Sequence, residues 1–121
     1  GLKGAMVVHG GLDEVSVSGP TRYARLSGGT ISRGDLRPED AGLSPLPADD
    51  LRVTSPRESA RKIVDLFEES LGGACLNSLL LNAAAAFMAV DGTVDLKDGV
   101  AMARDVLRSG RALEALNRAR A

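Results

Sequence analysis

Cysteine, histidine and aromatic residues are nearly absent from this sequence of 121 residues. It contains one cysteine, one histidine, one tyrosine, two phenylalanines and no tryptophan. A single cysteine excludes an intramolecular disulfide and favours a reducing, cytoplasmic location. A catalytic centre built from Ser, His and Asp, or from Cys and His, has almost no raw material. With few rings for base stacking and a net charge of −1, we expect no nucleic-acid partner.

Long hydrophobic runs and the common site motifs are also missing. No stretch approaches the roughly 18 consecutive apolar residues of a membrane span, and the apolar run at residues 5–8 is too short for a signal peptide. The sequence has no P-loop and no G-x-G-x-x-G, G-x-S-x-G or H-E-x-x-H motif. We therefore expect a soluble protein with no membrane partner, and we assign no catalytic residue and no cofactor-binding loop.

The composition is that of one globular domain. Hydrophobic residues make up 44% of the chain and charged residues 26%, which is wrong for disorder. We expect an α/β domain in which the strands come first. The apolar run at residues 5–8, followed by glycines, predicts a strand covered on both faces, as in a parallel sheet. Residues 21–26 and 30–36 flank Ser27-Gly28-Gly29 and predict a β-hairpin. We expect its arginines, Arg22, Arg25 and Arg33, on a solvated face, and a phosphate-binding face is the alternative.

The second half predicts helices, after a proline-rich and acidic surface loop at residues 37–56. Ser55, Pro56 and Glu58 match the capping box that starts a helix, and Gly72-Gly73 would end it. The next helix is apolar nearly all round, which predicts burial on most sides. Asp95 caps the one after. The expected helices span residues 56–71, 75–90, 96–108 and 111–121.

Two positions on the apolar helix are candidates for a special role. Cys75 is expected to be a small buried side chain, and a reactive thiol is the alternative. A buried Asn82 amide would need hydrogen-bond partners. It could contact a substrate, but we expect it to hold a neighbouring backbone segment.

The only constellation that looks like site chemistry is the adjacent pair Asp13-Glu14 near the end of the first strand. Successive side chains of an extended strand point to opposite faces, so both acids can face one ion only if the chain turns. Gly10-Gly11 gives the freedom for that turn. Magnesium suits such a pair, because it accepts one or two carboxylates and keeps waters or phosphate oxygens as other ligands. The alternative is a turn with solvated acids, and His9 is either a base or ligand or a hydrogen-bonded structural residue.

A series of segments, in order along the chain, resembles the C-terminal part of the anthranilate phosphoribosyltransferase family. They are residues 7–10 (VVHG), 11–16 (GLDEVS), 19–21 (GPT), 36–43 (LRPEDAGL), 80–86 (LLNAAAA), 96–100 (LKDGV) and 109–113 (SGRAL). There are two departures from the family pattern. The spacing between His9 and Asp13 is shorter than usual, and Arg52-Val53-Thr54 replaces the usual Gly-Gly-Asp.

The resemblance implies a cytoplasmic enzyme of tryptophan biosynthesis that transfers the phosphoribosyl group of phosphoribosyl pyrophosphate to anthranilate and releases pyrophosphate. It implies that Asp13 and Glu14 ligate Mg²⁺, the expected cofactor. It also implies the C-terminal portion of a nucleoside phosphorylase/phosphoribosyltransferase-type α/β domain, with short parallel strands, a hairpin and three to four helices. The whole enzyme would be a homodimer whose interface lies largely outside this chain.

By the same resemblance, residues 1–121 correspond to the C-terminal part of the catalytic domain. The family's N-terminal helical domain, its glycine-rich pyrophosphate loop and its anthranilate-binding arginine would all precede residue 1. We therefore expect the isolated chain to be inactive. Two other functions stay open: that of the related pyrimidine nucleoside phosphorylases, which transfer the sugar to phosphate, and that of a non-catalytic interaction module.

Overall fold

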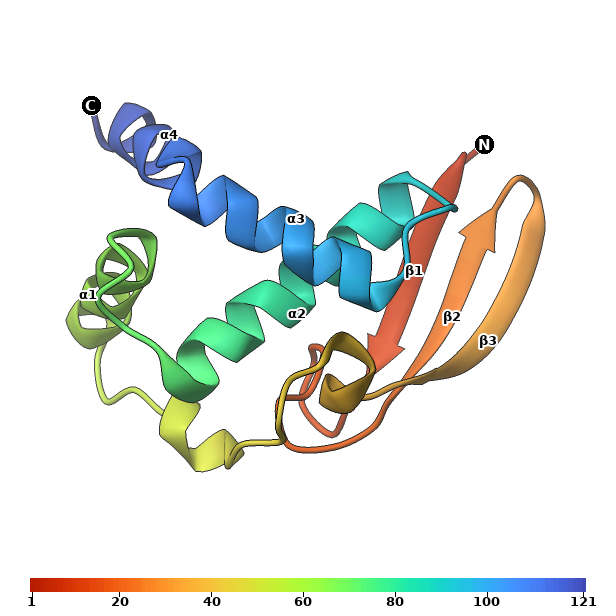
Figure 1. Ribbon diagram of the computed structural model, residues 1–121, viewed down its shortest axis with the longest axis horizontal. Helices are drawn as coiled ribbons and strands as arrows, with labels where there is room; N and C mark the ends of the chain where they lie inside the picture. The colour runs from red at the N-terminus through yellow and green to blue at the C-terminus, as the bar shows by residue number, and fades with distance from the viewer.

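The computed structural model describes residues 1–121 as a three-stranded sheet followed by a set of helices (Figure 1). The α/β class expected from the sequence is confirmed. The elements are β1 (Gly4–His9), β2 (Thr21–Ser27), β3 (Thr30–Leu36), the 3-10 helices η1 (Pro38–Ala41) and η2 (Ala48–Leu51), and the helices α1 (Pro56–Phe67), α2 (Gly73–Val90), α3 (Leu96–Arg108) and α4 (Arg111–Arg120).

The sheet is antiparallel throughout, in the order β1-β2-β3. β1 pairs with β2 from Gly4↔Ser27 to His9↔Arg22. The expected parallel pairing and double-sided cover of β1 are therefore wrong for this chain. Val7, on the side of the sheet away from the helices, is 70% exposed. A short apolar run shows that a strand is hydrophobic, but it does not fix the direction of its partner.

The hairpin forms as expected, with β2 and β3 in register from Thr21↔Leu36 to Ser27↔Thr30. Gly28 and Gly29 make the two-residue connection with φ of 56° and 80°. Positive φ at both central positions is the geometry that matches the twist of a hairpin, and glycine adopts it without strain.

Helix α2 lies at the centre of the molecule, between the sheet and the other helices (Figure 1). It packs against α3, β1 and η2. A third of its residues are buried, and of the others only Gly73, Ala86 and Val90 are exposed. The helix is thus covered on most sides, as expected, but much of this cover is partial. With 18 residues and a mean hydropathy of 1.6, α2 is long and apolar enough to cross a membrane. The core helices of soluble proteins also meet these two criteria, so they are weak evidence. The sequence predicted no such segment, because Asn77, Ser78 and Asn82 interrupt its apolar run.

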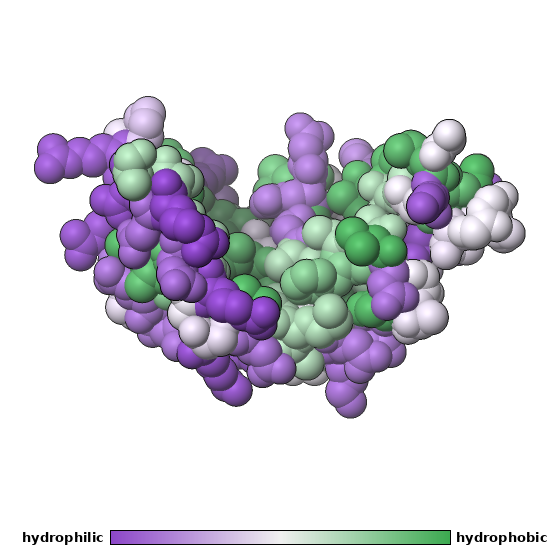
Figure 2. All heavy atoms as spheres, turned by 90° about the horizontal axis from the view of Figure 1, so that it is seen from above, coloured by the Kyte–Doolittle hydropathy of each residue, from purple (hydrophilic) through white to green (hydrophobic).

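The core joins the two halves of the chain. Val15, Val17 and Leu36 come from the strand region and contact a cluster of buried residues from α2 and α3, including Leu80 and Leu81, which are fully buried. Figure 2 shows a hollow in the surface, at the top of the picture, with hydrophobic residues on its floor and hydrophilic residues on much of its rim. Large hydrophobic side chains such as Ile63 and Val90 are also exposed.

Helix α1 begins where the sequence placed it but ends early. Ser55 is its N-cap, and the Ser55 hydroxyl accepts a hydrogen bond from the Glu58 N–H at 3.1 Å. The helix stops at Phe67 rather than at Leu71, and Glu69 has a φ of 57°. The chain therefore leaves the helix through a left-handed residue before the glycine pair is reached. The apolar spacing of Leu71 is misleading, since that residue lies outside the helix.

Candidate functional site

The acid pair lies where the chain passes from solvent into the core. After β1, the segment from Gly10 to Glu14 bends, and Gly11 has a φ of 86°. Asp13 is exposed and Glu14 is partly exposed, whereas the next residue, Val15, is only 2% exposed. The turn that the sequence required before both acids could face one ion is present.

Neither carboxylate of the pair belongs to an ion pair. The three ion pairs of the chain join Arg52 to Asp49, Arg61 to Asp65 and Lys62 to Glu58. The acids are thus available to an external cation. Whether they bind one stays a prediction.

The donor set fits magnesium better than a metal that needs a protein cage. No group of three or more His, Cys, Asp or Glu side chains converges anywhere in the chain. Tetrahedral zinc sites need three or four such ligands. Magnesium needs only one or two carboxylates, with waters and substrate phosphates completing the shell. Asp13 and Glu14 could therefore hold magnesium together with a phosphate-bearing substrate.

His9 lies apart from this chemistry. It is the exposed last residue of β1, in the row His9↔Arg22↔Asp35 across the sheet. It lines a shallow depression on the outer face of the sheet together with Val7 and Arg33. No cluster of ligands includes it, so the structure gives no support to a role as a metal ligand.

Gly10 and Thr21 shape the base of the acid loop. A Cβ built on Gly10 would lie 2.7 Å from the Thr21 Oγ1 and 2.9 Å from the Glu14 backbone oxygen. The Thr21 side chain is fully buried, and its Oγ1 accepts a hydrogen bond from the Ser16 N–H at 2.9 Å. The loop is therefore drawn tightly against the start of β2, and only glycine leaves room at position 10.

Asn82 holds the far side of the loop, as the sequence predicted. Its Oδ1 accepts a hydrogen bond from the Val15 N–H at 2.9 Å, and its Nδ2 donates to the Val15 carbonyl at 3.2 Å. Nδ2 also donates to the Ser78 carbonyl one turn earlier, at 2.9 Å. One side chain of α2 thus satisfies both backbone groups of the residue that follows the acid pair.

A cleft of about 390 Å³ opens next to these residues. Glu14, Lys62, Ser78 and Asn82 are among its lining residues, together with apolar side chains of α1 and η2. Cys75 also lines it, partly exposed, with its Sγ 3.7 Å from the Asp50 carbonyl oxygen. Cys75 is thus partly buried rather than buried as expected. Of the acid pair, Glu14 lines this cleft.

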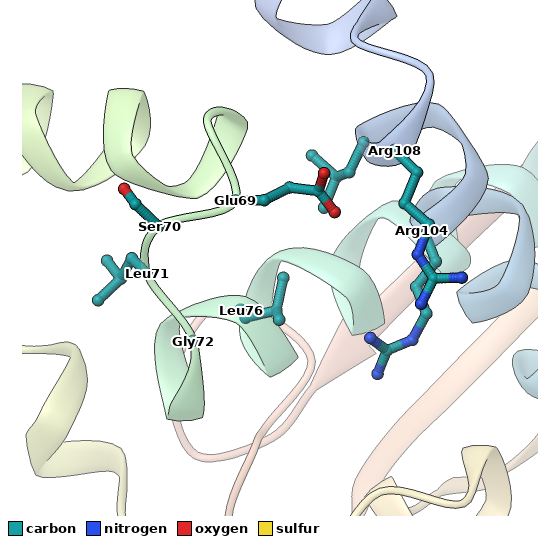
Figure 3. Close-up of a pocket in the computed structure, with 8 residues that line it drawn as sticks. Glu69, Ser70, Leu71, Gly72, Leu76, Arg104 and Arg108 are labelled. Atoms are coloured by element: carbon teal, nitrogen blue, oxygen red, sulfur yellow. The ribbon is translucent and has the colours of Figure 1, made fainter.

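A second cleft, of about 180 Å³, lies beside the first turns of α2, where Gly72 and Leu76 meet α3 (Figure 3). In the close-up, Glu69 of the α1–α2 connection faces Arg104 and Arg108 of α3. Neither acid of the pair lines this cleft. It is a junction between helices rather than a part of the acid site.

The two carboxyl groups with shifted pKa values lie elsewhere. The Thr54 N–H and hydroxyl, both 2.7 Å from the Glu58 Oε2, lower the pKa of Glu58 below its ordinary value of 4.5. The Thr93 N–H and hydroxyl lower the pKa of Asp91 in the same way. Both groups cap turns or helix ends and are structural.

The sequence missed one important contact. Arg25, expected on the solvated face of the hairpin, faces the helices instead. Its guanidinium donates to the carbonyl oxygens of Met88, at 2.6 and 3.0 Å, of Asp91, at 2.8 Å, and of Val94, at 3.2 Å. The last carbonyls of a helix need partners from outside it, and α2 has no basic residue of its own in its last turn. The lack of a basic residue there indicates that the helix end needs an outside donor, but it does not indicate that Arg25 is that donor.

The family model described as glycosyl transferase family, a/b domain, matches residues 1–113. The chain is 41% identical over 115 residues to an anthranilate phosphoribosyltransferase from Neisseria meningitidis, covering 93% of this chain and 32% of that protein. A similar protein from Sorangium cellulosum is 39% identical over 119 residues, with 98% and 34% coverage. The chain thus spans about a third of the length of these relatives.

Solved structures give the same likeness. Anthranilate phosphoribosyltransferase from Thermus thermophilus superposes with a TM-score of 0.80 and 34% identity, over 95% of this chain and 34% of that one. The enzyme from Saccharomyces cerevisiae in complex with PRPP and Mg gives 0.78 and 28%, over 94% and 33%. The same yeast enzyme with 4-fluoroanthranilate gives 0.80 and 27%, over 93% and 33%.

Proposed function

We propose, because this chain belongs to the glycosyl transferase family, a/b domain, that it is the C-terminal part of an anthranilate phosphoribosyltransferase. The whole enzyme would transfer the phosphoribosyl group of phosphoribosyl pyrophosphate to the amine of anthranilate. The products would be N-(5-phosphoribosyl)anthranilate and pyrophosphate, in tryptophan biosynthesis. The names of the relatives and the ligands of the yeast structures support this substrate pair.

The observation that carries the proposal is that Asp13 and Glu14, which belong to no ion pair, lie on a turn whose backbone is anchored on both sides. Glu14 lines the cleft that Asn82 also lines. We assign them the role of holding Mg²⁺ on the departing pyrophosphate. When bound, the metal supplies neutralisation of the negative charge that develops there. The acids themselves need transfer no proton in this role.

The chain supplies one wall of this site, and the hollowed apolar face supports that view. The floor of the hollow in Figure 2 is apolar, and two-thirds of α2, its central helix, are not buried. The outer edge of β1 also has no strand beside it. An open edge and an apolar face are surfaces that another part of a protein covers. We propose that the additional length of the relatives corresponds to that cover.

The experiment compares the full polypeptide that carries this chain with the 121-residue chain alone. Each is incubated with phosphoribosyl pyrophosphate, anthranilate and magnesium, and the loss of anthranilate fluorescence is followed. The full polypeptide should turn over and the isolated chain should not. Phosphorolysis of a pyrimidine nucleoside by the full polypeptide, without transfer to anthranilate, would replace the proposal with the nucleoside phosphorylase reaction. No activity with either pair would favour an interaction module.

Assembly and location are further parts of the proposal. We propose a cytoplasmic homodimer whose interface lies largely outside residues 1–121. The unpaired Cys75 supports a reducing compartment. Light scattering of the full polypeptide at micromolar concentration should give the mass of two chains, and a monomer would contradict the assignment.

Magnesium alone should bind the isolated chain weakly, since substrate oxygens would supply other ligands, and calorimetry tests this.

A further inference from the structure

The backbone after the acid pair is held by a side chain that lies 67 residues away in the sequence. Asn82 sits on α2, between the fully buried Leu81 and Ala84. Its amide accepts from the Val15 N–H and donates to the Val15 carbonyl. The two bonds fix the peptide planes on both sides of Val15. One of these planes begins at the carbonyl carbon of Glu14, so Asn82 limits how the acid residue can rotate.

The same segment has a second anchor. The Ser16 N–H donates to the buried Thr21 Oγ1 at 2.9 Å. On the other side of the acids, Gly10 packs so closely on Thr21 that a Cβ would lie 2.7 Å from its hydroxyl. Both ends of the exposed turn are thus fixed to rigid elements, whereas the acids between them are free. A short turn with two fixed ends can present its side chains in a narrow range of directions.

We infer that Asn82 is a positioning residue for the metal-binding carboxylates of Asp13 and Glu14. The inference rests on the proposed function for the role of the metal. The two hydrogen bonds from Asn82 to Val15, which we call the clamp, do not depend on it. Ligands held in place by neighbouring groups bind metals more tightly, because less freedom is lost on binding. The Asn82 amide touches neither the metal nor the substrate in this role. It acts through the backbone of Val15.

The test begins with hydrogen exchange of the full polypeptide without metal or substrate. In Asn82→Ala, the segment at residues 12–16 should exchange about tenfold faster, as expected for the loss of its hydrogen bonds. Asn77→Ala is the matched control, because Asn77 lies on the same helix and lines no cleft beside the acids. Unchanged exchange in Asn82→Ala would overturn the clamp. This arm needs no activity, so it stands even if the proposed reaction fails.

The second arm measures the magnesium concentration needed for half-maximal phosphoribosyl transfer. Asn82→Ala should raise it about tenfold or more, with the KM for anthranilate little changed, as is typical when a group that orients metal ligands is lost. Asn77→Ala should leave both values unchanged. Faster exchange with an unaltered magnesium requirement would show that Asn82 has only a structural role and would overturn the inference. A wild-type protein without transfer activity would refute the proposed function instead.

Asn82→Asp guards against an alanine variant that does not fold. It keeps an acceptor for the Val15 N–H but loses the donor to the Val15 and Ser78 carbonyls, so its effects should have the same direction. If neither variant folds, hydrogen exchange of the wild-type protein tests the clamp. The Val15 amide should then be among the slowest between residues 10 and 18, and exchange as fast as that of Leu12 would overturn the clamp.

Discussion

The contact between Arg25 and the end of α2 predicts a large effect of a single substitution. Arg25→Met keeps most of the side-chain stem on β2 but removes the guanidinium. Three carbonyl groups then lose their donor. Hydrogen bonds to a charged group contribute about 1.5–3 kcal/mol in protected positions. Here Arg25 is only half-buried, and water can replace part of the loss. We therefore expect the free energy of unfolding to fall by about 2 kcal/mol, including the favourable cation at a helix C-terminus.

Urea unfolding of the 121-residue chain, followed by far-UV circular dichroism, measures this loss. For a domain of this size the same change corresponds to a fall in Tm of about 8 °C. Arg22→Met is the matched control, because Arg22 lies on the same strand and is exposed on the outer face. Its effect should stay within about 0.5 kcal/mol. Arg25→Lys should recover only part of the loss, since one ammonium cannot reach all three carbonyls.

The reasoning would be refuted if Arg25→Met and Arg22→Met were equally stable. That result would mean that the carbonyls of Met88, Asp91 and Val94 are satisfied by water at no cost. A loss in Arg25→Met that Arg25→Lys recovers completely would also contradict the argument. The stabilisation would then come from charge near the helix end and not from the fork of hydrogen bonds.

Three further predictions concern the acid pair, the helix packing and the pH dependence. Asp13→Asn in the full polypeptide should raise the magnesium requirement of the proposed phosphoribosyl transfer by at least about tenfold, measured by magnesium titration of the rate. Gly99→Ala should destabilise the chain by about 1–3 kcal/mol, measured by urea unfolding, since its Cβ would lie 2.7 Å from the Ala84 Cβ. Thr54→Ala should raise the pKa of Glu58 part of the way towards 4.5, since the hydroxyl is lost but the stronger bond from the backbone N–H stays, as seen by NMR titration of the carboxyl group.

The sign of the last effect follows from the lowered pKa. A carboxyl group whose pKa is lowered by folding stabilises the protein when it is ionised. This stabilisation is complete above the pKa of the unfolded state, 4.5, and is lost as the pH falls through the lower pKa of the folded state. Thr54→Ala should therefore reduce the loss of stability that occurs as the pH falls from 4.5 through the lower folded value. This prediction fails if the pKa of Glu58 does not change. The packing prediction fails if Gly99→Ala is as stable as the wild type. The metal prediction fails if Asp13→Asn has the magnesium dependence of the wild type.

Local features of the fold followed from local sequence. The turn at Gly28-Gly29 and the caps at Ser55 and Asp95 depend on residues within a few positions of each other, and all three form as expected. The buried stripe of α3, from Leu96 to Leu107, follows from helical spacing in the same way. In each of these cases, the interacting groups are close together in the chain.

Features that depend on distant partners were not predictable. Nothing in residues 5–8 shows that β1 pairs with an antiparallel neighbour, because pairing direction depends on the connection and on what else joins the sheet. The role of Arg25 depends on α2 ending beside β2, more than 60 residues later. A solvated arginine and one that caps a helix look the same in the sequence of a strand.

The candidate site combines both kinds of information. The sequence points to Asp13 and Glu14, because adjacent acids after a glycine pair are a local pattern. It cannot show that the turn between them and the core is held from two sides, by Thr21 and by Asn82. The structure thereby changes the question asked of the acids. Two carboxylates on a mobile loop would be ordinary surface charge, whereas the backbone that carries Asp13 and Glu14 is anchored to a strand and to a central helix. It is that anchored backbone, tested through Asn82, that would separate a metal-binding pair from a solvated one.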